Sequence, residues 1–235
     1  MSRKTAGEKM TKYLIEPKEL FFDFDLALKK GRGSRYLNFG SDSAIEKYVD
    51  EGLELGKELV EPKATYAIGE NSQAIIEEFH LPTPLHKAES LAFGISSIGT
   101  ALEEKVDELM ENGNFTLSNI LDSVGSAAVN ETADRLGKKV LEYSRKKDLN
   151  NTRAFSPGSG ASHWKIKNQR LIFDFLSPEE LGVSLTASFT MVPKKSSSFV
   201  IGLGKEVQQA DDLFSCEGCT RSDCPYRHTP RKSAV

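Results

Sequence analysis

The sequence is poor in cysteine and tryptophan and carries no large surplus of either charge. Its 235 residues include three cysteines and one tryptophan, and the formal net charge is −3 at pH 7. A small negative net charge excludes the global basic field that recruits nucleic acid or an anionic membrane surface. An odd number of cysteines, crowded into nine residues near the C-terminus, argues against a disulfide framework.

Long apolar runs and common catalytic signatures are also lacking. No run approaches the roughly 18–20 apolar residues of a membrane span. The first residues contain Lys and Arg, but no apolar segment follows them as it would in a secretory signal. Neither a P-loop nor an H-E-x-x-H zinc motif occurs. We therefore expect a cytoplasmic protein with a real core, since 38% of its residues are hydrophobic.

The spacing of apolar residues predicts a domain of mixed secondary structure. Helical spacing predicts helices over residues 41–60, 101–110, 116–143 and 164–176. A continuous apolar run predicts a buried strand over residues 91–98. Small residues from Gly125 to Ala128 indicate that another element approaches the longest helix closely.

The most regular pattern lies in residues 183–191, where apolar residues alternate strictly with Ser and Thr. Such alternation predicts a half-buried strand. Pro193 then turns the chain, and residues 198–203 predict a second strand, so we expect the two to pair as an antiparallel hairpin. Strands without regular helical crossovers indicate an α+β fold, with helices packed against an antiparallel sheet.

The cysteines form the segment CEGCTRSDCPYRH, which predicts a metal site. Cys216 and Cys219 are spaced as C-x2-C, Cys224 follows after four residues, and His228 lies four residues further on. Three thiolates suit a [4Fe–4S] cluster, and three thiolates with one imidazole suit tetrahedral zinc. The alternative, surface thiols without a metal, requires this clustering to be chance.

A glycine-bearing loop is the second candidate site. Gly158 and Gly160 would let backbone amides approach a ligand, and Arg153 offers a forked donor for a carboxylate or phosphate. The loop comprises Arg153, Ala154, Phe155, Ser156, Pro157, Gly158, Ser159 and Gly160. The alternative is an ordinary connection with a surface arginine.

Two further features could either contact a ligand or simply face solvent. The hydroxyls of the alternating segment, Thr186 and Ser188 among them, could line a polar pocket or face solvent. Glu131, beside the small residues of the long helix, could face a ligand or be a solvated surface charge.

In combination these segments resemble the activation domain of vitamin B12-dependent methionine synthase, in its free-standing, cysteine-tailed versions from anaerobes. The resemblance spans roughly residues 30–228 and is carried by residues 153–205, 96–115 and 120–143. Cys216 to Cys224, followed by Tyr226 and Arg227, matches the family's C-x2-C-x4-C tail. Ser159 stands where the family has the tyrosine of S-P-G-Y, and Ala187 where it has the glutamate of L-T-E-S.

The resemblance implies an α+β domain over residues 31–204, with an N-terminal extension (1–30) and a C-terminal appendage (205–235). It implies S-adenosylmethionine binding by Arg153, residues 156–160, Thr186 and Ser188. It also implies a partner, a corrinoid-binding protein or methyltransferase, because the D-x-H-x-x-G motif of corrinoid carriers is absent here. A ferredoxin- or flavodoxin-type donor would supply electrons.

The leading hypothesis is therefore a reductive activation protein that positions S-adenosylmethionine for remethylation of cobalamin, with an iron–sulfur cluster as electron relay. The alternative is a non-catalytic adaptor that binds a corrinoid protein and has a zinc-stabilised tail. A zinc-knuckle-like RNA binder is disfavoured by the negative net charge and by the tail's single aromatic residue, Tyr226.

Overall fold

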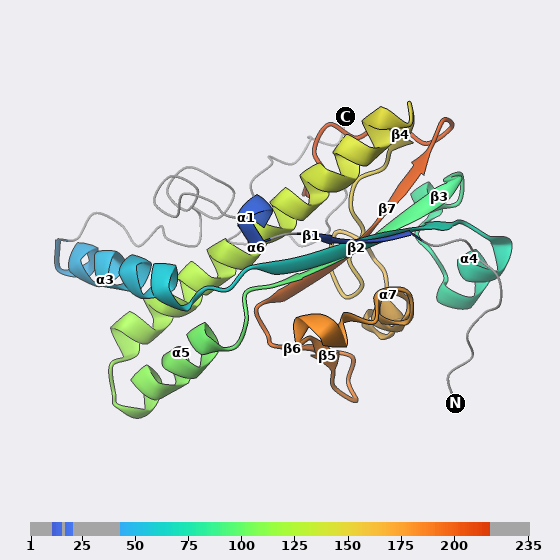
Figure 1. The fold of residues 1–235 in the computed structure, drawn as a ribbon. Coiled ribbons are helices and arrows are strands. Elements are labelled where there is room, and N and C mark those ends of the chain that lie inside the picture. Colours follow the sequence, from blue (N-terminus) through green and yellow to red (C-terminus); the bar gives the residue numbers. More distant parts are fainter. Residues whose placement is uncertain (1–10, 16, 21–42, 217–235) are drawn as a thin grey trace, which may run out of the picture.

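The computed structural model describes residues 11–15, 17–20 and 43–216 (Figure 1). Its helices are α1 (Pro17–Leu20), α3 (Ser43–Leu59), α4 (Gln73–Phe79), α5 (Ala101–Glu111), α6 (Phe115–Lys146) and α7 (Gln169–Leu176), with 3-10 turns η2 (Thr83–Leu85), η3 (Ile166–Asn168) and η4 (Pro178–Leu181). Its strands are β1 (Thr11–Ile15), β2 (Lys63–Glu70), β3 (Ser90–Ser97), β4 (Asn150–Asn151), β5 (Ser184–Leu185), β6 (Met191–Val192) and β7 (Ser196–Gly204).

Five strands form one antiparallel sheet in the order β1-β2-β3-β7-β4. The central strands β3 and β7 pair along their whole length, from Ser90 opposite Leu203 to Ser97 opposite Ser196. Both are buried on both faces, which explains why their sequences are apolar runs rather than alternating ones. The predicted α+β class, with helices packed on an antiparallel sheet, is confirmed.

The sheet has a different helical cover on each face. The C-terminal half of α6 packs on one face, where Leu136 and Val140 meet Ala92, Phe199 and Ile201. On the other face α4, α7 and the loop around Trp164 enclose a core that contains Phe93 and Ile95. Figure 1 shows α6 crossing the sheet obliquely and α7 on the opposite side.

The N-terminal half of α6 extends past the sheet and forms a helical unit with α3 and α5 (Figure 1). This unit has its own apolar core, in which Leu53, Leu102 and Val124 are buried. A Cβ at Gly125 would lie 2.6 Å from Cδ2 of Leu102 and 3.3 Å from Cε of Lys195, so α5 and the connection between β6 and β7 both approach α6 closely there. Among the described residues, no helix combines the length and hydrophobicity needed to cross a membrane.

The predicted single strand over residues 183–191 is wrong. β5 takes two residues of this segment, and β6 begins at its last residue, Met191; the two strands pair only with each other and are joined by a tight turn. Phe189 takes a left-handed φ of 63° in that turn, which reverses the chain without a glycine. The predicted pairing with residues 198–203 is also wrong, because β7 pairs with β3 and β4 instead.

Both ends of the described chain pack against the domain. β1, from the segment assigned to an N-terminal extension, pairs with β2 as the edge of the main sheet. Val207 and Leu213, from the segment assigned to an appendage, are buried in the cores on the two faces. The folded unit therefore includes residues on either side of 31–204.

Candidate functional site

The loop from Thr152 to Trp164 runs along the open side of β7. The Thr152 amide donates to the Gly202 carbonyl at 2.9 Å, and Phe155 and Val200 exchange two backbone hydrogen bonds of 2.9 Å. The Phe155 and Trp164 side chains, 2% and 4% exposed, anchor the loop in the core on the α7 face. Two buried aromatic side chains thus fix a segment that has almost no regular structure of its own.

The backbone amides inside the loop donate mainly to groups of the loop itself. The amide of Gly158 donates to the Trp164 carbonyl at 2.7 Å, and that of Ser159 to the Ser156 carbonyl at 3.1 Å. The amide of Ser156 donates to the Ser162 hydroxyl at 2.8 Å. Gly158 has a φ of +82°, so the glycine there serves the turn. These bonds already use the Gly158 and Ser159 N–H groups, which are therefore poorly suited to the ligand contact expected from the sequence.

Arg153 closes the loop from its other side. Its guanidinium lies over the Phe155 ring, 4.3 Å from the ring centroid, and Nη2 donates to the Ala161 carbonyl at 2.6 Å. The ring contact orients a planar cation, and the short bond ties it to the loop. The cation predicted from the sequence is therefore held in a defined position over the Phe155 ring. Of the other predicted loop residues, Pro157 is buried and Gly160 is exposed.

Glu131 lies on α6, where its carboxylate pairs with Arg135 one turn further on, at 3.1 Å. The Glu131 side chain is 12% exposed and that of Arg135 is 31% exposed. Glu131 is thus a largely buried carboxylate with a cationic partner, and not a solvated surface charge.

Thr186 and Ser188 lie at the exposed tip of the β5–β6 hairpin. Their hydroxyls share a hydrogen bond of 2.9 Å, and the Thr190 amide donates to Thr186 Oγ1 at 3.1 Å. The side chains close a turn, as Ser and Thr commonly do. They do not form the straight row that alternation on a single strand implied.

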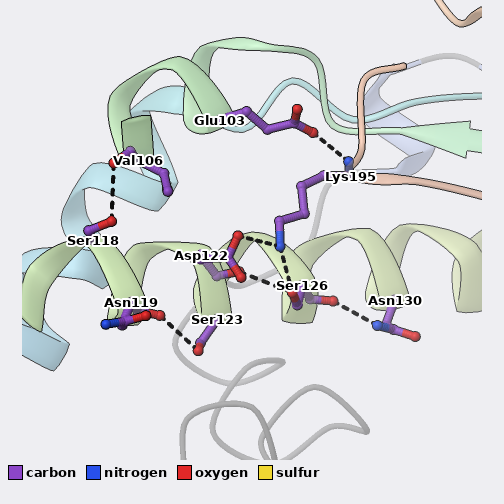
Figure 2. A network of polar contacts seen from close by, with 9 residues as sticks. All are labelled: Glu103, Val106, Ser118, Asn119, Asp122, Ser123, Ser126, Asn130 and Lys195. Atoms are coloured by element: carbon purple, nitrogen blue, oxygen red, sulfur yellow. Dashed lines mark hydrogen bonds and ion pairs between the residues drawn. The ribbon is translucent and has the colours of Figure 1, made fainter. Parts of the chain in front are cut away.

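The sequence did not single out Lys195, which stands at the centre of a polar network (Figure 2). Its Nζ donates to Asp122 Oδ1 at 2.7 Å and to Ser126 Oγ at 2.8 Å, and its amide donates to a Glu103 carboxylate oxygen. The run of small residues at Gly125 and Ser126 was the available signal, because it predicted a close approach without saying which residue approaches.

The metal site predicted from the cysteines lies mostly outside the described residues. Cys216 is described and half-buried, whereas Cys219, Cys224 and His228 are not described. Within the described ranges, no group of three or more His, Cys, Asp or Glu side chains could hold a metal ion.

A surface hollow of about 450 Å³ lies against α4, and none of the predicted site residues lines it. It is lined by Gln73, Ile76, Glu77, His80, Leu81 and His86. The His86 ring nitrogen Nε2 lies 2.8 Å from the Leu81 carbonyl oxygen, so that imidazole helps to hold the chain after α4.

Comparison with known proteins identifies the fold. No family model matches the sequence, and no curated protein matches it. A crystal structure of the MetH reactivation domain bound to AdoHcy matches with a TM-score of 0.56 at 12% sequence identity. The match covers 86% of this chain and 80% of that chain. The chain therefore has a fold like that of the MetH reactivation domain.

Proposed function

We propose that this chain is an accessory protein of corrinoid chemistry. It binds S-adenosylmethionine and holds the methyl group against cobalamin carried by a partner methyltransferase or corrinoid-binding protein. The observation that carries the proposal is the likeness of 86% of the chain to a domain solved with AdoHcy, the demethylated form of that ligand. When bound, the two cofactors supply the methyl-transfer chemistry, and the protein supplies position.

Two side chains fit the charges of the ligand. S-Adenosylmethionine presents a carboxylate, an ammonium group and a sulfonium, so its site needs a cation and an acceptor. The Arg153 guanidinium, oriented by Phe155 and Ala161, suits the carboxylate. The largely buried Glu131 carboxylate suits the ammonium group. The Gly158 and Ser159 amides fit less well, so of the groups expected to bind the carboxylate we assign this role to Arg153.

The proposal includes an electron path through the cysteine segment. Cys216, Cys219 and Cys224 would hold a [4Fe–4S] cluster, reduced by a ferredoxin- or flavodoxin-type protein, because cobalamin must be reduced before it is remethylated. With His228 as a fourth ligand the same segment would hold zinc instead.

A second candidate function is a non-catalytic adaptor that binds a corrinoid protein and keeps a zinc-stabilised tail. Two observations favour it. The loop amides are already hydrogen-bonded within the loop, and the Thr186 and Ser188 hydroxyls bind each other. A loop whose polar groups are satisfied keeps its shape without a ligand.

Calorimetric titration with S-adenosylmethionine, with and without a cobalamin-loaded corrinoid module, separates the two functions. Losing one charge-assisted pair costs about 1.5–3 kcal/mol, so Arg153→Ala should bind roughly 10- to 150-fold more weakly. Arg145→Ala removes an exposed arginine at the end of α6 and should bind like the wild type. No binding by the wild type at millimolar ligand in either condition would support the adaptor.

A further inference from the structure

The β5–β6 hairpin is a separate two-stranded sheet attached to the domain at its two ends. On the N-terminal side Val183 is fully buried in the core on the α7 face. On the C-terminal side Pro193 is buried, and its carbonyl accepts from the Ser196 hydroxyl at 2.7 Å. Isolated two-stranded hairpins are at best marginally stable in water, so these attachments, together with the packing of Met191 against the same core, hold the hairpin in place.

Lys195 alone makes hydrogen bonds to two helices and to the residue that follows β3. Its amide donates to Glu103 on α5, and its carbonyl accepts from the Ile98 amide, just after β3, at 3.2 Å. Its Nζ reaches Asp122 and Ser126 on α6. Figure 2 shows the side chain extended from the strand side toward α6, with the Glu103 carboxylate meeting the backbone from the opposite direction.

The Lys195 side chain is closely packed by its surroundings. The side chain is only 13% exposed, whereas its partner Asp122 is 53% exposed. Gly125 leaves room for the stem, because a Cβ there would lie 3.3 Å from Lys195 Cε. The Ser126 hydroxyl also donates to the Asp122 carbonyl at 3.0 Å, which fixes one acceptor of the ammonium group.

We infer that Lys195 is a positioning residue that fixes the β5–β6 hairpin, and with it Thr186 and Ser188, relative to the helical unit of α3, α5 and the first half of α6. The assignment of Thr186 and Ser188 to a binding surface rests on the proposed function. The mechanical part, that Lys195 holds the hairpin in place, depends only on the contacts described above.

Residue-resolved amide exchange of the ligand-free protein tests the mechanical part. The Thr186 and Phe189 amides report on the hairpin, since each donates a 2.9 Å hydrogen bond inside it. Lys195→Met keeps the apolar stem and removes the cation, and should speed their exchange by about 5- to 30-fold. Asp122→Asn should act in the same direction, and Lys195→Arg should restore much of the protection.

Lys194→Met is the matched control, because Lys194 is the exposed neighbour of Lys195. The Val200 amide on β7, which donates to the Phe155 carbonyl of the adjacent loop, is the internal reference and should keep its wild-type exchange rate. Equal exchange in Lys195→Met and Lys194→Met would overturn the inference. So would equal acceleration at Val200, which would indicate general destabilisation.

Titration of the same variants with a cob(II)alamin-loaded corrinoid-binding module of methionine synthase tests the functional part. Lys195→Met should bind about 5- to 30-fold more weakly than Lys194→Met, because the hairpin surface must first be ordered. Faster exchange with unchanged affinity would overturn the positioning role. No binding by the wild type would overturn the proposed function, and the exchange rates would still decide whether Lys195 anchors the hairpin.

Discussion

The ring of Phe199 on β7 lies directly over Gly94 on β3, and the two residues face each other across the centre of the sheet. A Cβ added at Gly94 would come within 2.5 Å of Phe199 Cζ and 2.6 Å of Cε2. Phe199 is fully buried and also packs edge-on against Phe214, with ring centroids 5.5 Å apart. Position 94 therefore requires glycine, because the Phe199 ring occupies the space of a Cβ and is enclosed on its other side by Phe214.

Gly94→Ala should lower the free energy of unfolding by about 1–3 kcal/mol, since overpacking forces a buried ring off its position. Gly69→Ala is the control, because a Cβ there would meet Phe175 at an ordinary 3.4 Å. Urea unfolding followed by circular dichroism measures both variants. Equal stability of the two would show that the Phe199 ring can move freely.

Trp164→Phe should lower the free energy of unfolding by about 1–3 kcal/mol. The Trp164 indole donates to the Phe79 carbonyl at 2.8 Å in a buried setting, and phenylalanine would leave that carbonyl without its donor. Lys165→Ala, at an exposed neighbour, should change stability by less than about 0.5 kcal/mol. Thermal unfolding by circular dichroism suits the comparison, since the variant lacks the chain's one tryptophan. If Trp164→Phe left the free energy of unfolding unchanged, the Phe79 carbonyl must accept a hydrogen bond from another donor.

Tyr66 should make the protein less stable at high pH. Burial, and then the neighbouring phenol of Tyr13, raise the pKa of Tyr66 from 10.0 to about 12. The folded protein favours the neutral phenol. Its contribution to the free energy of unfolding is therefore fully present below pH 10 and is lost as the pH rises toward 12. Between pH 9 and 11 the loss should be about 1 kcal/mol, and Tyr66→Phe should lack it. Urea unfolding at both pH values measures the difference, and parallel behaviour of the two proteins would contradict the raised pKa.

Anaerobically purified protein should be brown and contain iron and acid-labile sulfide. Cys219→Ser should weaken or abolish the metal, because a cluster with three protein thiolates loses one ligand. The far-ultraviolet circular dichroism should not change, since the main sheet and its helices are built from residues before the cysteine segment. Metal analysis and visible absorption check both statements. Stoichiometric zinc without iron would favour the adaptor.

The sequence was most informative where an element is long and periodic. The helix expected over 116–143 is α6, and the strand expected over 91–98 is β3, each within a few residues of its observed bounds. β2, which is as long as β3, was not predicted as a strand. Three of its buried positions, Ala64, Ala67 and Gly69, are small, so its apolar signal is weak.

Strand pairing could not be predicted, because it depends on contacts between distant residues. Ser196 on β7 lies opposite Ser97 on β3, about a hundred residues away, whereas the nearest apolar segment in sequence was 183–191. The alternation there also failed as a guide, since hydroxyl side chains can close a turn as readily as they can face solvent from a strand.

The candidate site was predicted in composition but not in geometry. The irregular loop is present, and Gly158 needs its positive φ. That the loop satisfies its own amides depends on Trp164, whose carbonyl accepts from Gly158 and whose ring is anchored in the core. Lys195 could not be found from local sequence, because its partners lie on helices 69 and 92 residues away.

The 32 residues of α6 belong to two cores, with Leu121 and Val124 in the helical unit and Leu136 and Val140 against the sheet. A helix of this length spans about 48 Å. Melting the helical unit alone would require α6 to break in its middle, where Ala127 and Ala128 are buried and Thr132 bonds back to Ala128 at 2.8 Å. The sheet and the helical unit should therefore unfold together, in one cooperative transition, although their side chains form separate cores.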